Sequence, residues 1–285
     1  MSYALALLSA LLYGVGDFLG GHATRRARAL TVTFASQAVG LIGLGTLVPV
    51  LSHEPPPCAD LAWGAAAGIA GAVGVLLLYR GLATGLASVV APITGVCSIG
   101  VPVVVGALLG ERPGATAVAG IALAMVAVTL LGQGGSSASP SDDRARAVRR
   151  GVPLALLSGL AIGAFLVCLG HTRPVSGMWP LLAARAVSVS SVALAIAVRR
   201  EPWLPARPAL PATLGSGLLD ILANAVYVLA VRQGTLGLTA TLASLYPAAT
   251  VALATLVWRE RLRPLQVTGI LVALLAMALI SWRTG

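Results

Sequence analysis

The sequence predicts an all-α polytopic membrane protein with ten transmembrane helices, arranged as two inverted five-helix repeats. Three observations support this fold class: the composition, the spacing of ten apolar segments, and a motif that occurs twice. The 285-residue chain is 58% hydrophobic and only 10% charged, whereas soluble proteins have about 25% charged residues. No single core could hide so much apolar surface from water, so the bilayer must be the solvent of this chain.

The ten apolar segments each come close to the roughly 20 residues that a helix needs to cross a bilayer. A closed β-barrel, the only other spanning structure, would need alternating strands of about ten residues, and the sequence has no such pattern. The predicted spans are residues 3–21, 30–50, 60–79, 86–109, 114–132, 152–170, 177–198, 210–231, 236–257 and 264–282.

A charged motif between two apolar runs occurs twice. Its glutamates, Glu111 and Glu260, stand among arginines in short loops, and we interpret them as forming salt bridges that lock these loops. A glycine follows each glutamate by nine residues, and both the glutamates and the glycines lie 149 residues apart. Recurrence at a fixed offset indicates an internal repeat. The first helices of the two halves match at the same offset: Ser9 with Ser158, Gly14 with Gly163, and His22 with His171.

The long hydrophilic segment of residues 133–150 is rich in glycine and serine, a composition typical of a flexible linker. It separates a first repeat, residues 2–132, from a second repeat, residues 151–282. Each half contains an odd number of spans, so the second half must enter the membrane with the opposite orientation. Inverted repeats of this kind are a building plan of secondary transporters.

The whole chain resembles the drug/metabolite transporter superfamily, specifically its ten-helix EamA-type branch. The resemblance rests on the run from Tyr13 to Gly21 at the end of the first helix, on the two glutamate motifs, and on Pro247. It covers roughly residues 2–131 and 151–281. It implies a carrier that moves small metabolites, often outward, by alternating access, with both termini in the cytoplasm.

The net charge of +10 comes from 19 arginines, almost all of them in predicted loops, where they anchor topology rather than bind nucleic acid. Fourteen would lie on one side of the membrane and four on the other, with Arg185 inside a span. The positive-inside rule then places both termini outside, against the usual arrangement of the superfamily. Both orientations remain open from the sequence.

Polar residues inside the spans are the candidate substrate-binding residues. Asp220, Asn224 and Tyr227 share one face of the eighth span, and Arg185 lies well inside the seventh. A charge at the centre of a spanning helix costs about 2.5–3.5 kcal/mol, so these groups must pair with each other, face a water-filled cavity, or both. An ion pair between Arg185 and Asp220 that only fixes packing is the alternative to a substrate site.

Three further residues complete the predicted site. Asp17 lies one turn beyond Tyr13 and is a candidate cavity-lining group or proton carrier, although a carboxylate at a helix end would serve structure alone. Gln37 occupies roughly the position in the first repeat that Arg185 has in the second, which suggests a pseudo-symmetric cavity wall. Tyr246 precedes Pro247 where a break in the helix would line a cavity.

The predicted function is a secondary transporter in the cell membrane that exports a small metabolite or drug-like solute by alternating access. The chain has no nucleotide-binding motif, so uphill transport would use an ion gradient, with Asp17 or Asp220 as the carrier of a coupling proton. No catalytic, cofactor-binding or metal-binding motif occurs, and the three cysteines match no metal or redox spacing. The alternatives are an intramembrane enzyme acting on a lipid-like substrate and a non-transporting membrane subunit.

Overall fold

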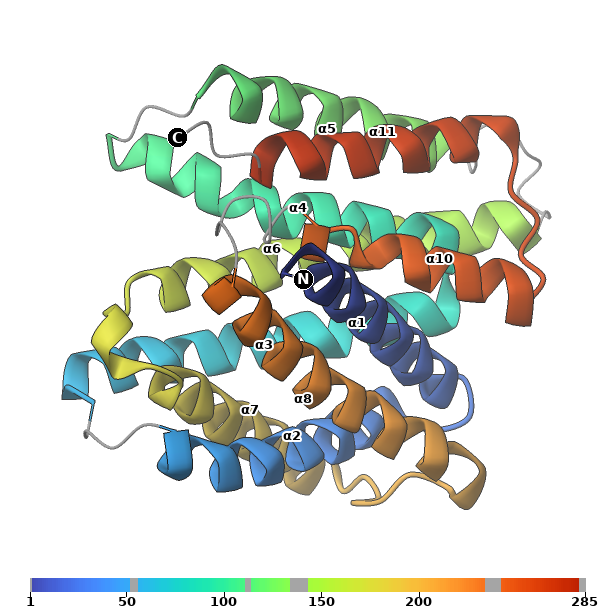
Figure 1. Cartoon of the computed structure of the whole chain (residues 1–285). Helices are drawn as coiled ribbons and strands as arrows, with labels where there is room; N and C mark the ends of the chain where they lie inside the picture. The colour runs from blue at the N-terminus through green and yellow to red at the C-terminus, as the bar shows by residue number, and fades with distance from the viewer. Residues whose placement is uncertain (1, 52–55, 111–113, 134–142, 234–241, 282–285) are drawn as a thin grey trace.

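The computed structural model describes residues 2–51, 56–110, 114–133, 143–233 and 242–281, and this part of the chain forms a helical bundle (Figure 1). Nine of its helices are long and apolar enough to cross a membrane, which agrees with the predicted fold class. The principal helices are α1 Ser2–Thr24, α2 Ala29–Leu51, α3 Cys58–Thr84, α4 Ala87–Leu108, α5 Ala115–Gln133, α6 Asp143–Gly170, α7 Trp179–Arg199, α8 Leu210–Gln233, α10 Tyr246–Val257 and α11 Pro264–Ser281.

Helix α6 begins inside the predicted linker. Because residues 143–150 are helical, the prediction of a flexible linker is wrong for them. Ala145 and Val148 are three residues apart and both are buried, so the segment presents an apolar helical face to the bundle. Asp143 lies in the first turn, where a negative charge stabilises a helix N-terminus. The rest of the linker, apart from Gln133 at the end of α5, lies outside the described residues.

The predicted ninth span is described only from residue 242. A turn at residues 244–245 interrupts it, and α10 starts at Tyr246 with Pro247 in its first turn. Proline is favoured in the first turn of a helix because its missing N–H has no helical partner there. The helix is therefore broken beside Tyr246, as the sequence suggested.

Two hydrogen bonds show how closely the halves are related. The Ser9 hydroxyl donates to the carbonyl oxygen of Ala223 at 2.9 Å, and the Ser158 hydroxyl donates to that of Gly74 at 2.8 Å. Donors and acceptors both lie 149 residues apart in the sequence. The first bond joins α1 to α8, and the second joins α6 to α3 with the halves exchanged. Each half thus packs its first helix on the third helix of the other half.

Helices α5 and α11 pair with each other along one face of the bundle (Figure 1). A Cβ atom added to Gly120 would lie 2.7 Å from a side-chain carbon of Ile280, and one added to Gly269 would lie 2.9 Å from Leu131. The two glycines are again 149 residues apart, and so are Leu131 and Ile280. The glycine lies on α5 in the first contact and on α11 in the second. Glycine is needed at both because the two helices approach too closely for any larger residue.

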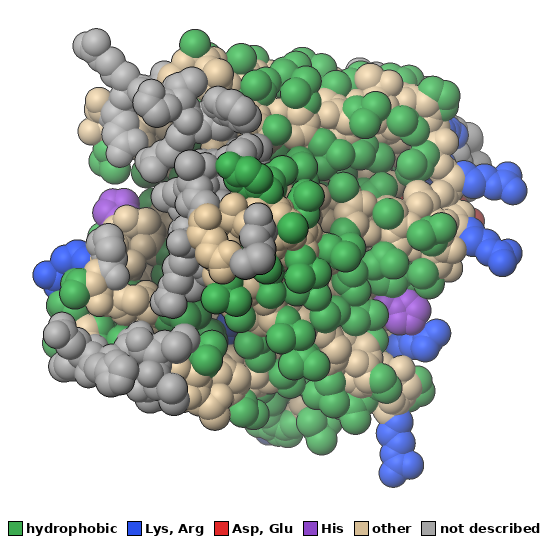
Figure 2. All heavy atoms as spheres, in the orientation of Figure 1, with side chains coloured by type: hydrophobic (Ala, Val, Ile, Leu, Met, Phe, Trp, Pro, Cys, Tyr) green, Lys and Arg blue, Asp and Glu red, His purple; other side chains and the backbone are tan. Residues whose placement is uncertain are grey.

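One end of the bundle is rich in arginine. It is the end at which α1 stops and α2 starts, and most arginines visible in Figure 2 project from this edge of the molecule. Two ion pairs join loops there, Arg28 with Glu201 at 3.5 Å and Arg25 with Glu260 at 4.0 Å. We call it the arginine-rich end.

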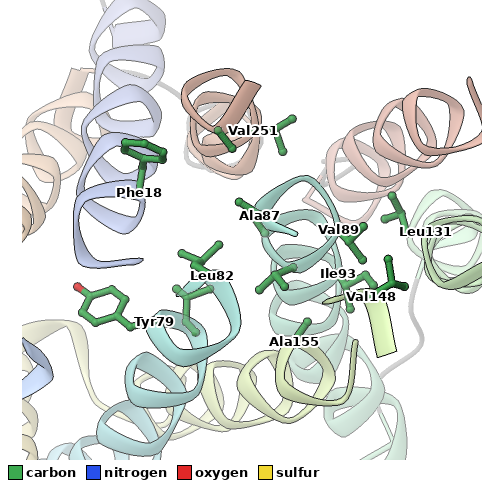
Figure 3. Close-up of a cluster of buried hydrophobic side chains, with 14 of the residues drawn as sticks. Phe18, Tyr79, Leu82, Ala87, Val89, Ile93, Leu131, Val148, Ala155 and Val251 are labelled. Atoms are coloured by element: carbon green, nitrogen blue, oxygen red, sulfur yellow. The ribbon is translucent and has the colours of Figure 1, made fainter. Parts of the chain in front are cut away.

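The main hydrophobic core lies toward the arginine-rich end. Phe18, Leu82 and Ile93 belong to it and are nearly inaccessible to solvent (Figure 3). Val148 comes from the start of α6 and Val251 from the middle of α10. Buried apolar side chains from several helices thus pack together toward this end of the bundle.

Glu260 joins two loops of the arginine-rich end mainly through hydrogen bonds to backbone amides, not through a salt bridge alone. Its two carboxylate oxygens accept hydrogen bonds from the backbone N–H groups of Ala87 and Ser88, at 3.0 and 3.1 Å. These amides form the start of α4, whose N-cap residue Leu86 gives no side-chain cap. Glu260 thus caps a helix of the other half, and the helix dipole favours its negative charge.

Aromatic contacts reinforce this closure. The Arg25 guanidinium lies 3.3 Å from the centroid of the Trp258 ring, and the Trp258 indole N–H donates to Nδ1 of His22 at 3.0 Å. The Phe18 ring packs against the Trp258 ring, with ring centroids 4.6 Å apart. Together with Glu260 and the start of α4, these residues form what we call the Glu260 clamp.

Candidate functional site

A cavity of about 500 Å³ lies in the middle of the bundle and extends toward the end opposite the arginines. Its lining comes from the parts of the helices beyond the main core, for example the second half of α6 and the first half of α7. Small-molecule sites have volumes of about 300–1,000 Å³. All seven residues predicted to bind substrate line this cavity: Asp17, Gln37, Arg185, Asp220, Asn224, Tyr227 and Tyr246.

Arg185 is the centre of the polar wall. Its guanidinium donates through Nη1 to the side-chain oxygen of Gln37 and through Nη2 to the carboxylate of Asp220. The side chains of Arg185 and Asp220 are 13% and 32% exposed, so the pair is partly shielded and still borders the cavity. Arg185 and Asp220 therefore form an ion pair and also line the cavity.

Asn224 and Tyr227 continue the polar face of α8. The Asn224 amide nitrogen donates to the carbonyl oxygen of Asp220 one turn earlier, at 2.7 Å. This bond fixes the orientation of the amide group beside the cavity. Tyr227 borders the same cavity, so the three residues form one stripe along α8, as their spacing predicts.

Asp17 differs from Asp220 because it has no cation beside it. Within the described chain, no hydrogen bond or ion pair joins its carboxyl group to another residue. Tyr13 lies one turn away on α1, and its ring meets that of Tyr246 edge to face, with centroids 6.4 Å apart. The carboxyl group therefore faces the cavity beside two aromatic rings.

The opposite wall of the cavity is apolar. It is formed by α3, α4 and α6, with Val75, Leu78, Ile99, Ile162 and Phe165 among its residues. Glycines permit the close packing behind it: a Cβ added to Gly74 would lie 2.7 Å from Ile162. The cavity thus offers charged and polar groups on one side and a hydrophobic surface on the other.

Several lining residues were not predicted. Ser188 is 4% exposed and its buried hydroxyl has no hydrogen-bond partner in the described chain, so it is free to bond a ligand. Its position three residues after Arg185, on the same helical face, is a signal that sequence reasoning could have used. Phe165 and Ile99 gave no such signal, because an apolar residue in an apolar span looks alike whether it faces lipid or a cavity.

A second set of contacts joins the helices at the end of the bundle opposite the arginine-rich end. The buried carboxylate of Asp60 at the start of α3 accepts hydrogen bonds from the Ser176 hydroxyl and from Nε of Arg173 at 3.3 Å. The rings of Trp63 and His171 stack with centroids 4.6 Å apart. These contacts hold the α6–α7 connection against α3, at the rim rather than within the cavity. Among the described residues, no group of three or more His, Cys, Asp or Glu could hold a metal ion.

Ten-helix architecture, inverted repeats and a central cavity with charged walls are the features of a multi-pass membrane transporter. A profile of the EamA-like transporter family matches residues 1–133 and 149–282, and the chain belongs to that family. Members of this family are transporters, and the protein is accordingly an integral protein of the cell membrane.

Comparison with solved structures supports the fold. Thirteen chains match, and one is a crystal structure described only as that of a protein, with a TM-score of 0.61 and 15% sequence identity. The alignment covers 98% of this chain and 96% of the other. At this identity the likeness extends to the fold alone. No curated protein matches the chain.

Proposed function

We propose that the protein is a proton-coupled secondary transporter that exports a small solute by alternating access, with Asp17 as the proton-carrying residue. The observation that carries this proposal is the Asp17 carboxyl group, which borders the central cavity and forms no ion pair with any described residue. An ionisable group inside a membrane protein defaults to a functional role because its burial is costly.

Asp17 suits a proton carrier better than Asp220 does. The negative charge of Asp220 is held by Arg185 in the ion pair, so a proton could bind there only after that pair had separated. Asp17 has no such competitor among the described residues. Asp17 can take up a proton when the cavity is open to one side of the membrane and release it when the cavity is open to the other side.

The difference between the two ends supports alternating access. The main core of buried side chains lies toward the arginine-rich end, and the cavity lies toward the other end. In an inverted repeat, the same contacts are available with the two halves exchanged, as the paired hydrogen bonds of Ser9 and Ser158 show. A rocking motion between the halves would open the clamped end and close the other.

The proposal assigns the arginine-rich end to the cytoplasm. Cytoplasmic loops carry an excess of arginine and lysine, and this end has most of the arginines. A reporter enzyme fused after Gly285 should therefore be active outside the cytoplasm. Cytoplasmic activity of the same fusion would reverse this assignment and support the arrangement usual in the superfamily.

Transport in liposomes tests the proton role. The protein is reconstituted, a pH gradient is imposed, and uptake of a panel of small metabolites is measured. Asp17→Asn should abolish uptake driven by the gradient, because the variant has no group at this position that could carry the proton. Asp220→Asn should weaken transport without removing its dependence on the pH gradient. Gradient-driven uptake that is unchanged in Asp17→Asn would refute the role of Asp17.

A further inference from the structure

We propose that the transported solute is a singly charged organic cation with an apolar body, bound by the Asp17 carboxylate in place of the proton. This inference rests on the proposed function and specifies the substrate class of the same cavity. It is carried by the balance of charges in the cavity and by the chemistry of its walls.

The charges of the described residues that line the cavity do not cancel. Arg185 contributes one positive charge, and Asp17 and Asp220 contribute two negative charges. Because Arg185 pairs with Asp220, the remaining negative charge is that of Asp17. The titratable groups close to Asp17 are Tyr13 on its own helix, Tyr79 on α3, Asp220 on α8 and Tyr246 on α10. Arg185 on α7 and Tyr227 on α8 line the same cavity.

An anionic solute fits these groups poorly. To bind Arg185 it would have to share the guanidinium with Gln37 and Asp220, which already accept one hydrogen bond each from its two terminal nitrogens. The cavity would then contain the solute anion and two carboxylates facing a single arginine. A monocation leaves the Arg185–Asp220 pair intact and neutralises the one carboxylate that lacks a partner.

The surroundings of Asp17 suit an organic cation in particular. Aromatic rings attract cations through their negatively charged faces, and Tyr13 and Tyr246 flank the carboxyl group. The apolar wall with Phe165 and Ile162 lies across the cavity and would contact the body of the solute. A small, strongly hydrated metal ion would gain nothing from such a wall, and it would leave most of the cavity unfilled.

Coupling to protons follows from a single shared site. Asp17 binds either one proton or one monocation, so each carrier cycle exchanges one for the other and moves no net charge. Protons bind more readily as the pH falls, so the affinity for the cation must decrease on acidification. Occupancy by the cation must release a proton at pH values where Asp17 is otherwise protonated.

Binding to the purified full-length protein tests the substrate class without relying on transport. Three probes share a similar shape and differ in charge: phenethyltrimethylammonium, its neutral carbon isostere 3,3-dimethylbutylbenzene, and 3-phenylpropanoate. Titration calorimetry should show the cation binding at least about tenfold more tightly than the other two, a difference of roughly 1.4 kcal/mol. Its affinity should decrease as the pH is lowered from 8.5 to 5.5.

Variants identify the group responsible. Asp17→Asn should weaken binding of the cation about tenfold or more and leave the neutral isostere unchanged, while Asp17→Glu should retain the preference for the cation. The control Asp143→Asn removes a carboxylate that is 94% exposed and distant from the cavity, and it should bind like the wild type. Tighter binding of the carboxylate probe, or cation binding that Asp17→Asn does not alter, would overturn the proposal.

The same probes separate this inference from the proposed function. Cation binding through Asp17 without proton-driven flux in liposomes would leave the substrate class standing and contradict the coupling. Proton-driven flux of an anion that does not compete with the cation probe would do the reverse. Melting temperatures of all variants, measured on the same preparations, show that altered binding is not a loss of folding.

Discussion

Arg185→Gln is expected to lower the thermal stability of the protein and to abolish most of its transport. The substitution leaves Asp220 without its cation and Gln37 without its donor, in a cavity that already contains Asp17. Removing one partner of a buried ion pair costs about 3–5 kcal/mol. The lower end of that range applies here, because Asp220 is 32% exposed toward the cavity.

A second substitution distinguishes a lost ion pair from a lost binding residue. The double variant Arg185→Gln with Asp220→Asn has no unpaired charge at this position, so it should recover most of the stability. Arg28→Gln is the control, since Arg28 is 65% exposed and its pair with Glu201 is worth only about 0–1 kcal/mol. Thermal unfolding in detergent measures stability. A double variant no more stable than Arg185→Gln would contradict the pairing argument.

Glu260→Gln is expected to open the arginine-rich end. An amide presents one acceptor oxygen where the carboxylate presents two, and it brings donor hydrogens toward the N–H groups of Ala87 and Ser88. It also loses the attraction between a negative charge and the start of α4. The loss of roughly 1–3 kcal/mol would shift the equilibrium between the two proposed states about fivefold or more toward the open one.

Accessibility of a buried position measures this shift. Ser216 is 1% exposed, behind the clamp, where its hydroxyl bonds Tyr79 at 2.8 Å and the carbonyl oxygen of Gly16 at 2.8 Å. In a chain whose three native cysteines are replaced by serine, a cysteine at position 216 should react slowly with a maleimide, and faster when Glu260→Gln is added. Glu201→Gln removes a different acid at the same end and should leave the rate unchanged. Equal rates in all three chains would show that Glu260 does not control this end.

The sequence predicted the polar half of the cavity for a physical reason. A charged or amide side chain in a span must find partners within the protein, so Arg185, Asp220 and Gln37 had few places to lie other than together. The correspondence of Gln37 with Arg185 across the repeats became a direct hydrogen bond. No comparable sequence signal marks the apolar half of the cavity. An apolar side chain such as that of Phe165 suits a position that faces lipid as well as one that faces the cavity.

The other contacts were hard to predict because their partners are distant in the sequence. Glu260 was expected to form salt bridges with nearby arginines, and an arginine, Arg25, does lie 4.0 Å away. Its principal partners are backbone amides of α4, which no pattern of side chains reveals. The glycine and serine content of residues 133–150 predicts a linker and hides the helical start of α6, although the buried positions Ala145 and Val148 keep a helical spacing.

The paired bonds of Ser9 and Ser158 have a consequence for how the chain holds together. In a symmetric dimer, each contact occurs twice with the two subunits exchanged. The same duplication of contacts occurs here within one chain, where α1 packs on α8 and α6 packs on α3. The first helix of each half packs more extensively on the other half than on its own, so we expect that neither half folds alone. The molecule resembles two antiparallel subunits joined covalently, and we expect its smallest folding unit to be the pair.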